Sequence, residues 1–371
     1  MGNNEQLIIK KAFQSNWITS QGPQLELFEN KISNYIDIKK SVAVSSGTAA
    51  IHLALLSLGI KKNDTVICQS FTFVGTANPV IYLGAEPIFV DSENDTWNMD
   101  PNYLVNAIKS NIRKGKKPKP IIFVHLYGMP AKIHEIKNIS KKYNIPIVED
   151  AAEALGSSYK NLKCGSFGDI GILSFNGNKI ITTSGGGALL SNNYKLMEKA
   201  KFLSTQAKDK YIHYEHSNIG YNYRMSNILA AIGIAQLSLI NKRVKSRRNN
   251  FKIYKKYLSK FDGINFLEEP NNSKNKDMFF SNRWLTTIIF DKKILKIINK
   301  NKIIKIFEKE NIEVRPLWKP MHLQPIFKKY QYFGKKNAQN LFKNGLCLPS
   351  GSNLKLNDFD RIFSCFNKVF K

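Results

Sequence analysis

One lysine lies in a polar, glycine-spaced segment that could hold it against a ligand. Lys179 follows the apolar, β-branched run at 170–173 and precedes three consecutive glycines, Gly185–Gly187. Glycine permits tight turns and close approach of the backbone to a ligand. A lysine in such a pocket can lose its proton and attack a carbonyl group, as Schiff-base lysines do. Taken alone, however, the segment is better explained as a glycine-rich hairpin with an exposed lysine than as a ligand pocket.

Further candidate groups come where expected strands end. The segment Ser45–Thr48 leads from a short strand at 41–44 directly into a helix, and backbone N–H groups at a helix start favour an anion. An ordinary serine N-cap predicts the same turn without a ligand. Asp150 ends another strand, and Phe71–Phe73 follows a third. Ligands of parallel sheets bind outside the carboxyl ends of the strands, so these segments are expected to converge.

The elements that must position these groups alternate along the chain. We expect strands at 41–44, 66–69, 87–90, 121–124, 146–150 and 284–290, and helices at 23–36, 45–55, 76–83, 101–110, 133–143, 194–203, 228–257, 294–310 and 358–370. Residues 1–23 are expected to be a mostly polar arm. The alternation is typical of a mostly parallel sheet covered by helices. A chain of 371 residues has room for a large domain, placed at 1–250, and a smaller one at 251–371.

The formal net charge of +28 suggests a nucleic-acid or anionic-membrane partner. The basic residues are spread over most of the chain, and no zinc-finger spacing or aromatic RNA-binding pattern accompanies them. We therefore interpret them as solvated basic faces that favour an anionic substrate.

The sequence has no apolar run long enough to span a membrane and no signal peptide. The four cysteines are scattered without metal-ligand spacing, which fits reduced thiols in the cytoplasm and predicts no metal site.

Five segments in order give the chain a family resemblance that covers residues 17–352. They are 45–50, 149–156, 165–169, 174–179 and 220–227. Together they resemble the DegT/StrS family of nucleotide-sugar aminotransferases. That resemblance implies the α/β aspartate-aminotransferase fold, which is fold type I of the enzymes that use pyridoxal 5'-phosphate (PLP). It also implies a large, mostly parallel-sheet domain with a smaller C-terminal α/β domain.

The resemblance assigns the two catalytic residues. Lys179 would bind PLP covalently, release it to the amino donor and then move a proton between cofactor and sugar. Asp150 would pair with the pyridine nitrogen, where a carboxylate keeps the ring protonated and electron-withdrawing. A strand-end residue that caps a turn remains the alternative for Asp150.

Further residues would bind the cofactor. Gly47, Thr48 and Ser174 would hold its phosphate, and Phe73 would stack on its ring, although an aromatic residue there is otherwise core. Glu153 stands near the PLP hydroxyl, where many relatives carry glutamine. While ionised, a carboxylate there can accept a hydrogen bond but cannot donate one.

The resemblance also implies a homodimer with shared active sites, because Asn227 would reach the phosphate of the neighbouring subunit. Segments 213–216, 281–284, 315–322 and 347–350 are similar to aminotransferases that make UDP-4-amino-4,6-dideoxy-N-acetylglucosamine, on the way to bacillosamine-type sugars. Arg315 and His322 are expected to bind the substrate, and Arg224 either does so or braces the subunit interface. Trp284 and Trp318 fit core packing as well as sugar contact.

These expectations describe a cytoplasmic, PLP-dependent enzyme of glycan biosynthesis. It would move an amino group from glutamate to C4 of a UDP-linked 4-keto-6-deoxy-N-acetylhexosamine. Alternatives are a GDP-linked or dTDP-linked sugar and a sugar dehydratase, which carries histidine in place of Lys179. A basic nucleic-acid or membrane-surface protein is the non-enzyme alternative, and it gives no reason for Lys179, Asp150 and Asn227 to occur together.

Overall fold

The computed structural model describes residues 1–2, 4–271, 278–297 and 299–370. Its centre is an eight-stranded sheet in which six neighbouring strands are parallel and β9 runs antiparallel to both its neighbours. In spatial order the strands are β1 (Lys40–Val44), β9 (Gly187–Ser191), β8 (Ile170–Ser174), β5 (Ile147–Asp150), β4 (Ile121–Val124), β2 (Thr65–Gln69), β3 (Glu86–Val90) and β14 (Tyr332–Phe333). The predicted helix-covered, mostly parallel sheet is confirmed.

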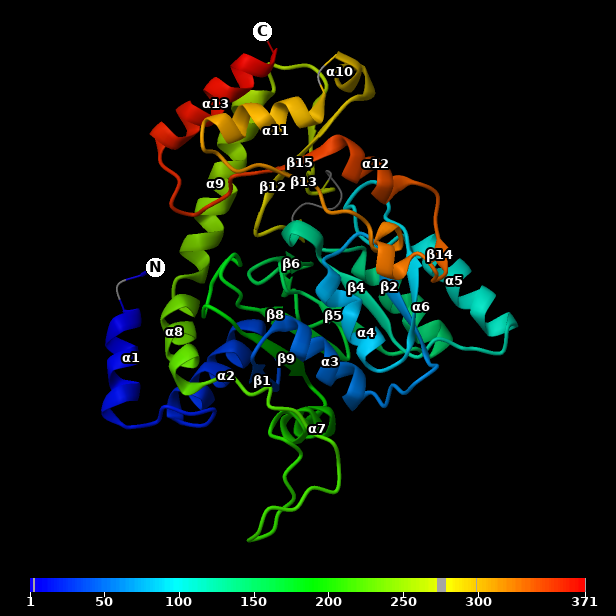
Figure 1. Cartoon of the computed structure of the whole chain (residues 1–371), viewed down its shortest axis with the longest axis vertical. Helices are drawn as coiled ribbons and strands as arrows, with labels where there is room; N and C mark the ends of the chain where they lie inside the picture. Colours follow the sequence, from blue (N-terminus) through cyan, green and yellow to red (C-terminus); the bar gives the residue numbers. More distant parts are fainter. Residues whose placement is uncertain (3, 272–277, 298, 371) are drawn as a thin grey trace.

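Helices cover both faces of this sheet (Figure 1). The strands can be buried on both sides because their residues are apolar without a break, as in β2, where all five residues are buried. Successive side chains point to opposite faces, so Ile67 packs into one core and its neighbours Val66 and Cys68 into the other. The first core includes α2 (Pro23–Ile36), α5 (Pro101–Arg113), α6 (Ile133–Tyr143) and α8 (Asn227–Leu237); the second includes α3 (Gly47–Ser57), α4 (Asn78–Tyr82) and α7 (Tyr194–Ser204).

A second, antiparallel sheet forms a third core with the C-terminal helices. Its strands are β10 (Ile264–Phe266), β12 (Thr286–Phe290), β15 (Gly345–Leu348) and β13 (Arg315–Pro316), in spatial order. The helices of this part are α9 (Ile240–Leu258), α10 (Lys292–Ile297), α11 (Lys300–Lys309), α12 (Asn337–Asn344) and α13 (Leu356–Phe370). Among the helices of the described residues, none combines the length and apolar character needed to cross a membrane.

The smaller elements complete the chain. A three-stranded sheet contains β11 (Phe279–Phe280), β6 (Ser158–Tyr159) and β7 (Leu162–Lys163), and 3-10 turns lie at Val74–Thr76, Leu126–Gly128, Met321–Leu323 and Pro325–Phe327. β14 returns to the large sheet, although it lies between β13 and β15 in the sequence. The division of the chain at residue 250 stays a prediction.

Three expectations about helices were wrong. The expected arm at 1–23 contains α1 (Glu5–Gln14), which packs against α8. The helix expected at 228–257 is two helices, α8 and α9, with a break at 238–239. The break falls where the sequence changes from the apolar α8, which packs on α1 and α2, to the basic α9, which runs to the second sheet. The helix expected at 294–310 is also two, and Asn299 begins the second by accepting a hydrogen bond from Asn301 N–H at 2.8 Å.

Candidate active site

A hollow of about 400 Å³ opens at the carboxyl ends of β5 and β8. Seven of the residues predicted to bind or use the cofactor line it: Gly47, Thr48, Phe73, Asp150, Glu153, Ser174 and Lys179. They come from four separate parts of the large sheet, so the convergence expected at the strand ends is present.

Lys179 lies on the connection between β8 and β9, which pair antiparallel. The base of this connection is closed by hydrogen bonds from Phe175 N–H to Gly186 O at 2.8 Å and from Thr183 N–H to Phe175 O at 2.9 Å. The interpretation as a hairpin therefore describes the backbone correctly. It fails for the lysine, whose side chain is only 11% exposed because it turns into the hollow.

The glycine run brings two backbones together. A Cβ added to Gly187 would lie 2.5 Å from the Gly47 nitrogen, closer than a side chain can approach a backbone atom. The start of β9 therefore packs directly against the start of α3. Ser46 caps this helix by accepting a hydrogen bond from Ala49 N–H at 3.0 Å. The first N–H groups of α3 and its dipole make this end of the hollow suitable for a phosphate group.

Asp150 is almost fully buried and already hydrogen-bonded on both oxygens. Oδ2 accepts the Thr76 hydroxyl at 2.7 Å, and Oδ1 accepts Ala152 N–H at 3.1 Å. The Thr72 hydroxyl lies 2.8 Å from that of Thr76, which continues the chain of hydrogen bonds. Burial raises the pKa of Asp150, and the Thr76 hydrogen bond opposes that rise. The carboxylate thus caps a turn and also lines the hollow.

Glu153 lies beside the lysine, with its Oε1 3.6 Å from Lys179 Nζ. Its other oxygen accepts the Tyr127 N–H at 2.7 Å. Burial raises the pKa of Glu153 to about 7, although the Lys179 charge acts in the opposite direction. Burial therefore favours the protonated form of Glu153 more than in an exposed glutamate. In that form it can donate a hydrogen bond.

Aromatic side chains form another wall of the hollow. Lys179 Nζ lies 4.2 Å from the centre of the Trp284 ring, and the Trp284 indole N–H donates to Asn178 O at 2.8 Å. Trp318 packs against Phe73 and Tyr127, with ring centres 5.4 Å apart in each pair. Phe73 is 56% exposed at the hollow's edge. Both tryptophans line the site, while Trp284 is also part of the core.

The two arginines predicted to bind the substrate do not line this hollow. Arg224 is buried against Glu29, with Nη1 2.6 Å from Oε1, and also donates to Ala43 O. Arg224 therefore joins α2 to the large sheet within its own chain. Arg315 is 75% exposed and pairs with Glu313. The substrate role expected for Arg315, and expected for Arg224 as one of two alternatives, stays a prediction.

Asn227 and His322 also lie outside the lining of the hollow. Asn227 is fully buried; its oxygen accepts Leu25 N–H and its amide nitrogen donates to Trp17 O, both at 3.0 Å. Its predicted reach to a neighbouring subunit would require these bonds to break. His322 Nε2 faces the Gln339 amide at 3.1 Å and Nδ1 faces the Ser70 hydroxyl at 2.6 Å. Burial lowers the pKa of His322 to about 4, so the ring is neutral.

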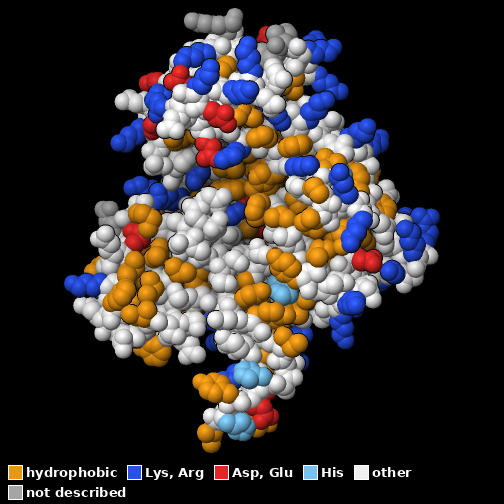
Figure 2. All heavy atoms as spheres, in the orientation of Figure 1, with side chains coloured by type: hydrophobic (Ala, Val, Ile, Leu, Met, Phe, Trp, Pro, Cys, Tyr) orange, Lys and Arg blue, Asp and Glu red, His pale blue; other side chains and the backbone are white. Residues whose placement is uncertain are grey.

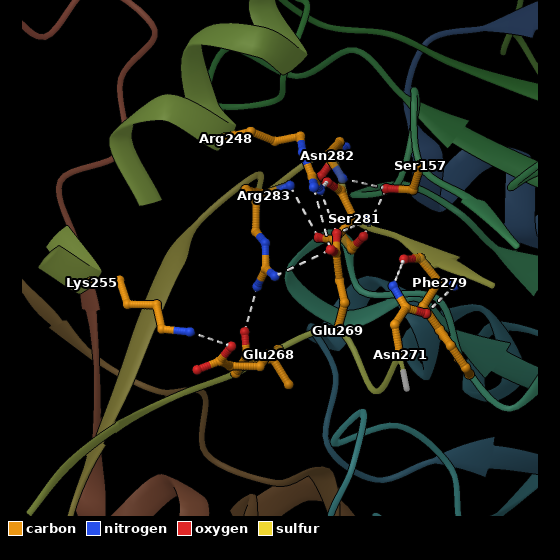
Figure 3. Close-up of polar contacts among 12 residues, drawn as sticks. Ser157, Arg248, Lys255, Glu268, Glu269, Asn271, Phe279, Ser281, Asn282 and Arg283 are labelled. Atoms are coloured by element: carbon orange, nitrogen blue, oxygen red, sulfur yellow. Dashed lines mark hydrogen bonds and ion pairs between the residues drawn. The ribbon is translucent and has the colours of Figure 1, made fainter. Parts of the chain in front are cut away.

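Asn282, whose backbone N–H donates to Ser157 Oγ (Figure 3), supports two residues of the hollow. Its amide donates to Glu153 O at 2.8 Å and to Leu155 O at 2.9 Å, and its oxygen accepts Trp284 N–H at 2.8 Å. Glu269 holds the same turn by accepting Ser281 N–H at 2.7 Å. The ion pairs of Glu269 with two arginines, shown in the same view, reinforce this contact.

Three buried residues of metal-ligand type, His125, Glu149 and Cys164, have ligand atoms within 4.8 Å of one another. Glu149 already accepts His125 Nε2–H at 2.8 Å and three backbone N–H groups of the turn at 165–168. His125 Nδ1 accepts Ala131 N–H, which places the ring proton on Nε2. Burial raises the pKa of the Cys164 thiol. We interpret this cluster as hydrogen-bonded support next to Asp150.

Comparison with known proteins identifies the family. The model of the DegT/DnrJ/EryC1/StrS aminotransferase family matches residues 1–367. The chain belongs to this family. Its expected PLP dependence, aminotransferase chemistry and fold are thereby established.

Individual relatives match over nearly their whole length. The chain is 47% identical to the "Putative pyridoxal phosphate-dependent aminotransferase EpsN" of Bacillus subtilis (strain 168), over 100% of this chain and 94% of that protein. It is 36% identical to the GDP-perosamine synthase of Escherichia coli O157:H7, over 99% and 95%. A UDP-4-amino-4,6-dideoxy-N-acetyl-beta-L-altrosamine transaminase of Campylobacter jejuni (strain 81-176) is 33% identical, over 98% and 95%. The crystal structure of a family aminotransferase from Brucella abortus matches with a TM-score of 0.90 at 29% identity, over 99% and 95% of the two chains.

The hollow of this aminotransferase fits PLP in its donor groups. A buried carboxylate, Asp150, suits a protonated ring nitrogen, and the N-terminus of α3, which lines the same hollow, suits a phosphate group. Lys179 supplies the amine between them. Sequence reasoning missed Thr76, whose only signal was a hydroxyl beyond a strand end, and Tyr127, which acts through its backbone and leaves no signal in the sequence.

Proposed function

We propose that this aminotransferase transfers an amino group from glutamate to C4 of a UDP-linked 4-keto-6-deoxy-N-acetylhexosamine, in bacterial glycan biosynthesis. The observation that carries the proposal is the grouping of Lys179, Asp150 and Glu153 in one hollow beside the start of α3. A lysine amine, a ring-binding carboxylate and an anion-binding helix end are the groups that amino transfer with PLP requires.

Each side chain has a role that follows from its contacts. PLP, when bound, supplies an electron-withdrawing ring. Asp150, oriented by Thr76 and Ala152, holds the ring nitrogen and its proton. Lys179 Nζ, set between Glu153 and the Trp284 ring, moves a proton at the reacting carbon. Glu153 can hold or release a proton near pH 7, because burial has raised its pKa to about 7. Gly47, Thr48 and Ser174 hold the phosphate.

The choice of sugar is supported by relatives and by charge. The altrosamine transaminase from Campylobacter acts on a UDP-linked 4-amino-4,6-dideoxy sugar, as its name states. The surface in Figure 2 carries many lysine and arginine side chains, which favour an anionic nucleotide sugar. A GDP-linked sugar is the second candidate, because the GDP-perosamine synthase is 36% identical.

A homodimer with shared sites completes the proposal. The segment 208–220 projects from the body at the bottom of Figures 1 and 2, and the side chains of Tyr211, Ile212, Tyr214 and Ile219 are all more than half exposed. Apolar side chains so exposed mark an interaction surface. A second copy of the chain would cover them and add polar groups that the hollow of one chain lacks.

The deciding experiment offers 4-keto-6-deoxy sugars linked to UDP, GDP and dTDP, each with glutamate, and compares kcat/KM, because specificity is expressed in that ratio. The proposal expects the UDP-linked N-acetylhexosamine to be preferred and the product to carry its new amine on C4. Preference for the GDP-linked sugar would select the second candidate. Amination at C3 would contradict both.

A further inference from the structure

The segment that carries Lys179 borders a second, unassigned hollow of about 290 Å³. Residues 179–182 form part of its wall, and Arg243 and Arg247 of α9 line it as well. An adjoining hollow of about 440 Å³ shares Arg243 and Ser352 with it and adds Lys242. The surroundings of this space are therefore basic.

Arg247 is a buried cation with too few partners. The residue is only 8% exposed, and its Nη1 donates a hydrogen bond to Trp284 O at 2.8 Å. Its Nε is buried and has no partner among the described residues. Burial lowers the pKa of Arg247 to about 10, and the nearby charge of Arg243 adds to this effect. A buried charge without a counter-ion is costly, so the hollow is electrostatically incomplete.

No carboxylate in the described part of the chain relieves this charge. None of the ion pairs there includes Arg243 or Arg247. Glu5 lies on the adjacent helix α1, but its Oε1 accepts from Gly2 N–H and from the Gln236 amide. Arg243 has instead a neutral partner, the Ser352 hydroxyl, at 3.0 Å.

The beginning of α9 adds to the positive field. This helix of 19 residues has no side-chain cap and no acidic residue in its first turn. Lys242 and Arg243 occupy that turn, where the helix dipole disfavours cations. A bound anion would offset the charge of the two guanidinium groups.

We propose that the hollow between Arg243 and Arg247 binds a small oxyanion of the phosphate class. Two guanidinium groups match a doubly charged anion better than a single carboxylate. Lys179 borders both this site and the hollow that fits PLP, but the two are otherwise lined by different residues. The proposal does not depend on which sugar the enzyme aminates.

An anion bound at this site would affect Lys179 through two sets of contacts. Residues 179–182 are part of the wall, so an anion would order the segment that carries Lys179. Arg247 also holds the Trp284 carbonyl, and the Trp284 ring lies over Lys179 Nζ. We infer that the anion steadies Lys179 and its aromatic neighbour together.

Calorimetric titration of the PLP-loaded, full-length protein with inorganic phosphate tests the proposal, with ionic strength held constant by chloride. The phosphate subsite of the cofactor hollow is then filled by PLP itself. Saturable binding of one phosphate per chain is expected. Arg243→Gln should weaken it about tenfold or more, because a charge-assisted hydrogen bond is worth about 1.5–3 kcal/mol. Lys245→Gln removes the same charge from an exposed position of α9 outside both hollows and should bind as the wild type does.

Hydrogen exchange gives a second readout. Phosphate should slow the exchange of amides in residues 177–182 in the wild type and in Lys245→Gln, but not in Arg243→Gln. Absence of saturable binding to the wild type, or equal binding by the two variants, would overturn the proposal. If the wild type binds no phosphate and Arg243→Gln weakens self-association, a carboxylate of a second copy fills the site. The free-anion proposal is then wrong. No sugar is present in these experiments, so their failure leaves the proposed aminotransferase specificity untouched.

Discussion

The Thr76 hydroxyl donates a hydrogen bond to Asp150 Oδ2 at 2.7 Å, inside the hollow that fits PLP. Because the bond is to an ionised carboxylate, it favours the charged form of Asp150 against the effect of burial. Thr76 thus orients the carboxylate that we propose to hold the ring nitrogen, and its hydroxyl is in turn 2.8 Å from that of Thr72.

Replacement of Thr76 tests this role. Thr76→Val keeps the shape but removes the hydroxyl, so the pKa of Asp150 should rise and the acid limb of the kcat–pH profile should move to higher pH. A loss of about tenfold to a hundredfold in kcat is expected, from the worth of about 1.5–3 kcal/mol for a hydrogen bond to a charged group. Thr76→Ser should restore the wild-type profile, and Thr72→Val should change it far less. An unchanged acid limb in Thr76→Val would show that the hydroxyl only fills space.

Replacement of Lys179 tests the covalent link. Lys179→Ala should retain PLP through the contacts of Asp150 and the α3 N-terminus, but borohydride should no longer fix the cofactor to the chain. Amino transfer should fall by several orders of magnitude, because the residue that moves the proton is gone. Mass spectrometry after reduction measures the link. Normal turnover by Lys179→Ala would refute the assignment.

The raised pKa of Glu153 predicts a pH-dependent contribution to stability. Between the ordinary pKa of 4.5 and the folded value of about 7, the folded chain binds more protons at Glu153 than the unfolded chain does. The contribution is therefore fully present below pH 4.5 and is lost as the pH rises through about 7. Glu153→Gln stays neutral and keeps an oxygen for Tyr127 N–H. In denaturant unfolding of the apo protein, its stability relative to wild type should increase from pH 5 to pH 8; a constant difference would contradict the raised pKa.

Asn227 offers a test between a role in its own chain and a role across a dimer. Its buried amide serves Leu25 N–H and Trp17 O, so Asn227→Ala should cost about 1–3 kcal/mol of unfolding free energy through unsatisfied backbone groups. The loss is measured by denaturant unfolding. The shared-site prediction instead expects mixtures of Asn227→Ala and Lys179→Ala to regain activity in hybrid dimers. Recovered activity in the mixture with unchanged stability of Asn227→Ala would favour the cross-subunit role.

The limits of elements with a strong local pattern could be predicted from the sequence. β4 and α6 have the predicted limits because one is an unbroken apolar run and the other an amphipathic segment that ends at Asn144 in the left-handed region. Ser45–Thr48, Asp150 and Phe71–Phe73 were expected to converge because the strand ends of one parallel sheet must lie along one edge. Lys179 was singled out by its glycine-spaced segment, and its catalytic role stays a prediction.

The expected substrate residues were less predictable, because their positions depend on packing between distant segments. Arg224 and Arg315 are of the right chemical type for an anionic sugar. Arg224 pairs with Glu29, which is 195 positions away in the sequence. Arg315 pairs with Glu313, two residues away. No local pattern indicates such a partner. The partner expected for the exposed 208–220 segment, a second copy of the chain, likewise stays a prediction.

The pairing of β14 with β3 has a consequence for the integrity of the large sheet. Besides that ladder, Asp91 accepts hydrogen bonds from the backbone N–H groups of Lys335, Asn337 and Ala338 at 3.0–3.1 Å. A fragment that ends near residue 250 would leave β3 as a bare edge and Asp91 without these donors. Open strand edges recruit other chains, so such a fragment should precipitate or form fibres. Residues after about 250 therefore protect the preceding part of the chain against aggregation, in addition to forming a core of their own.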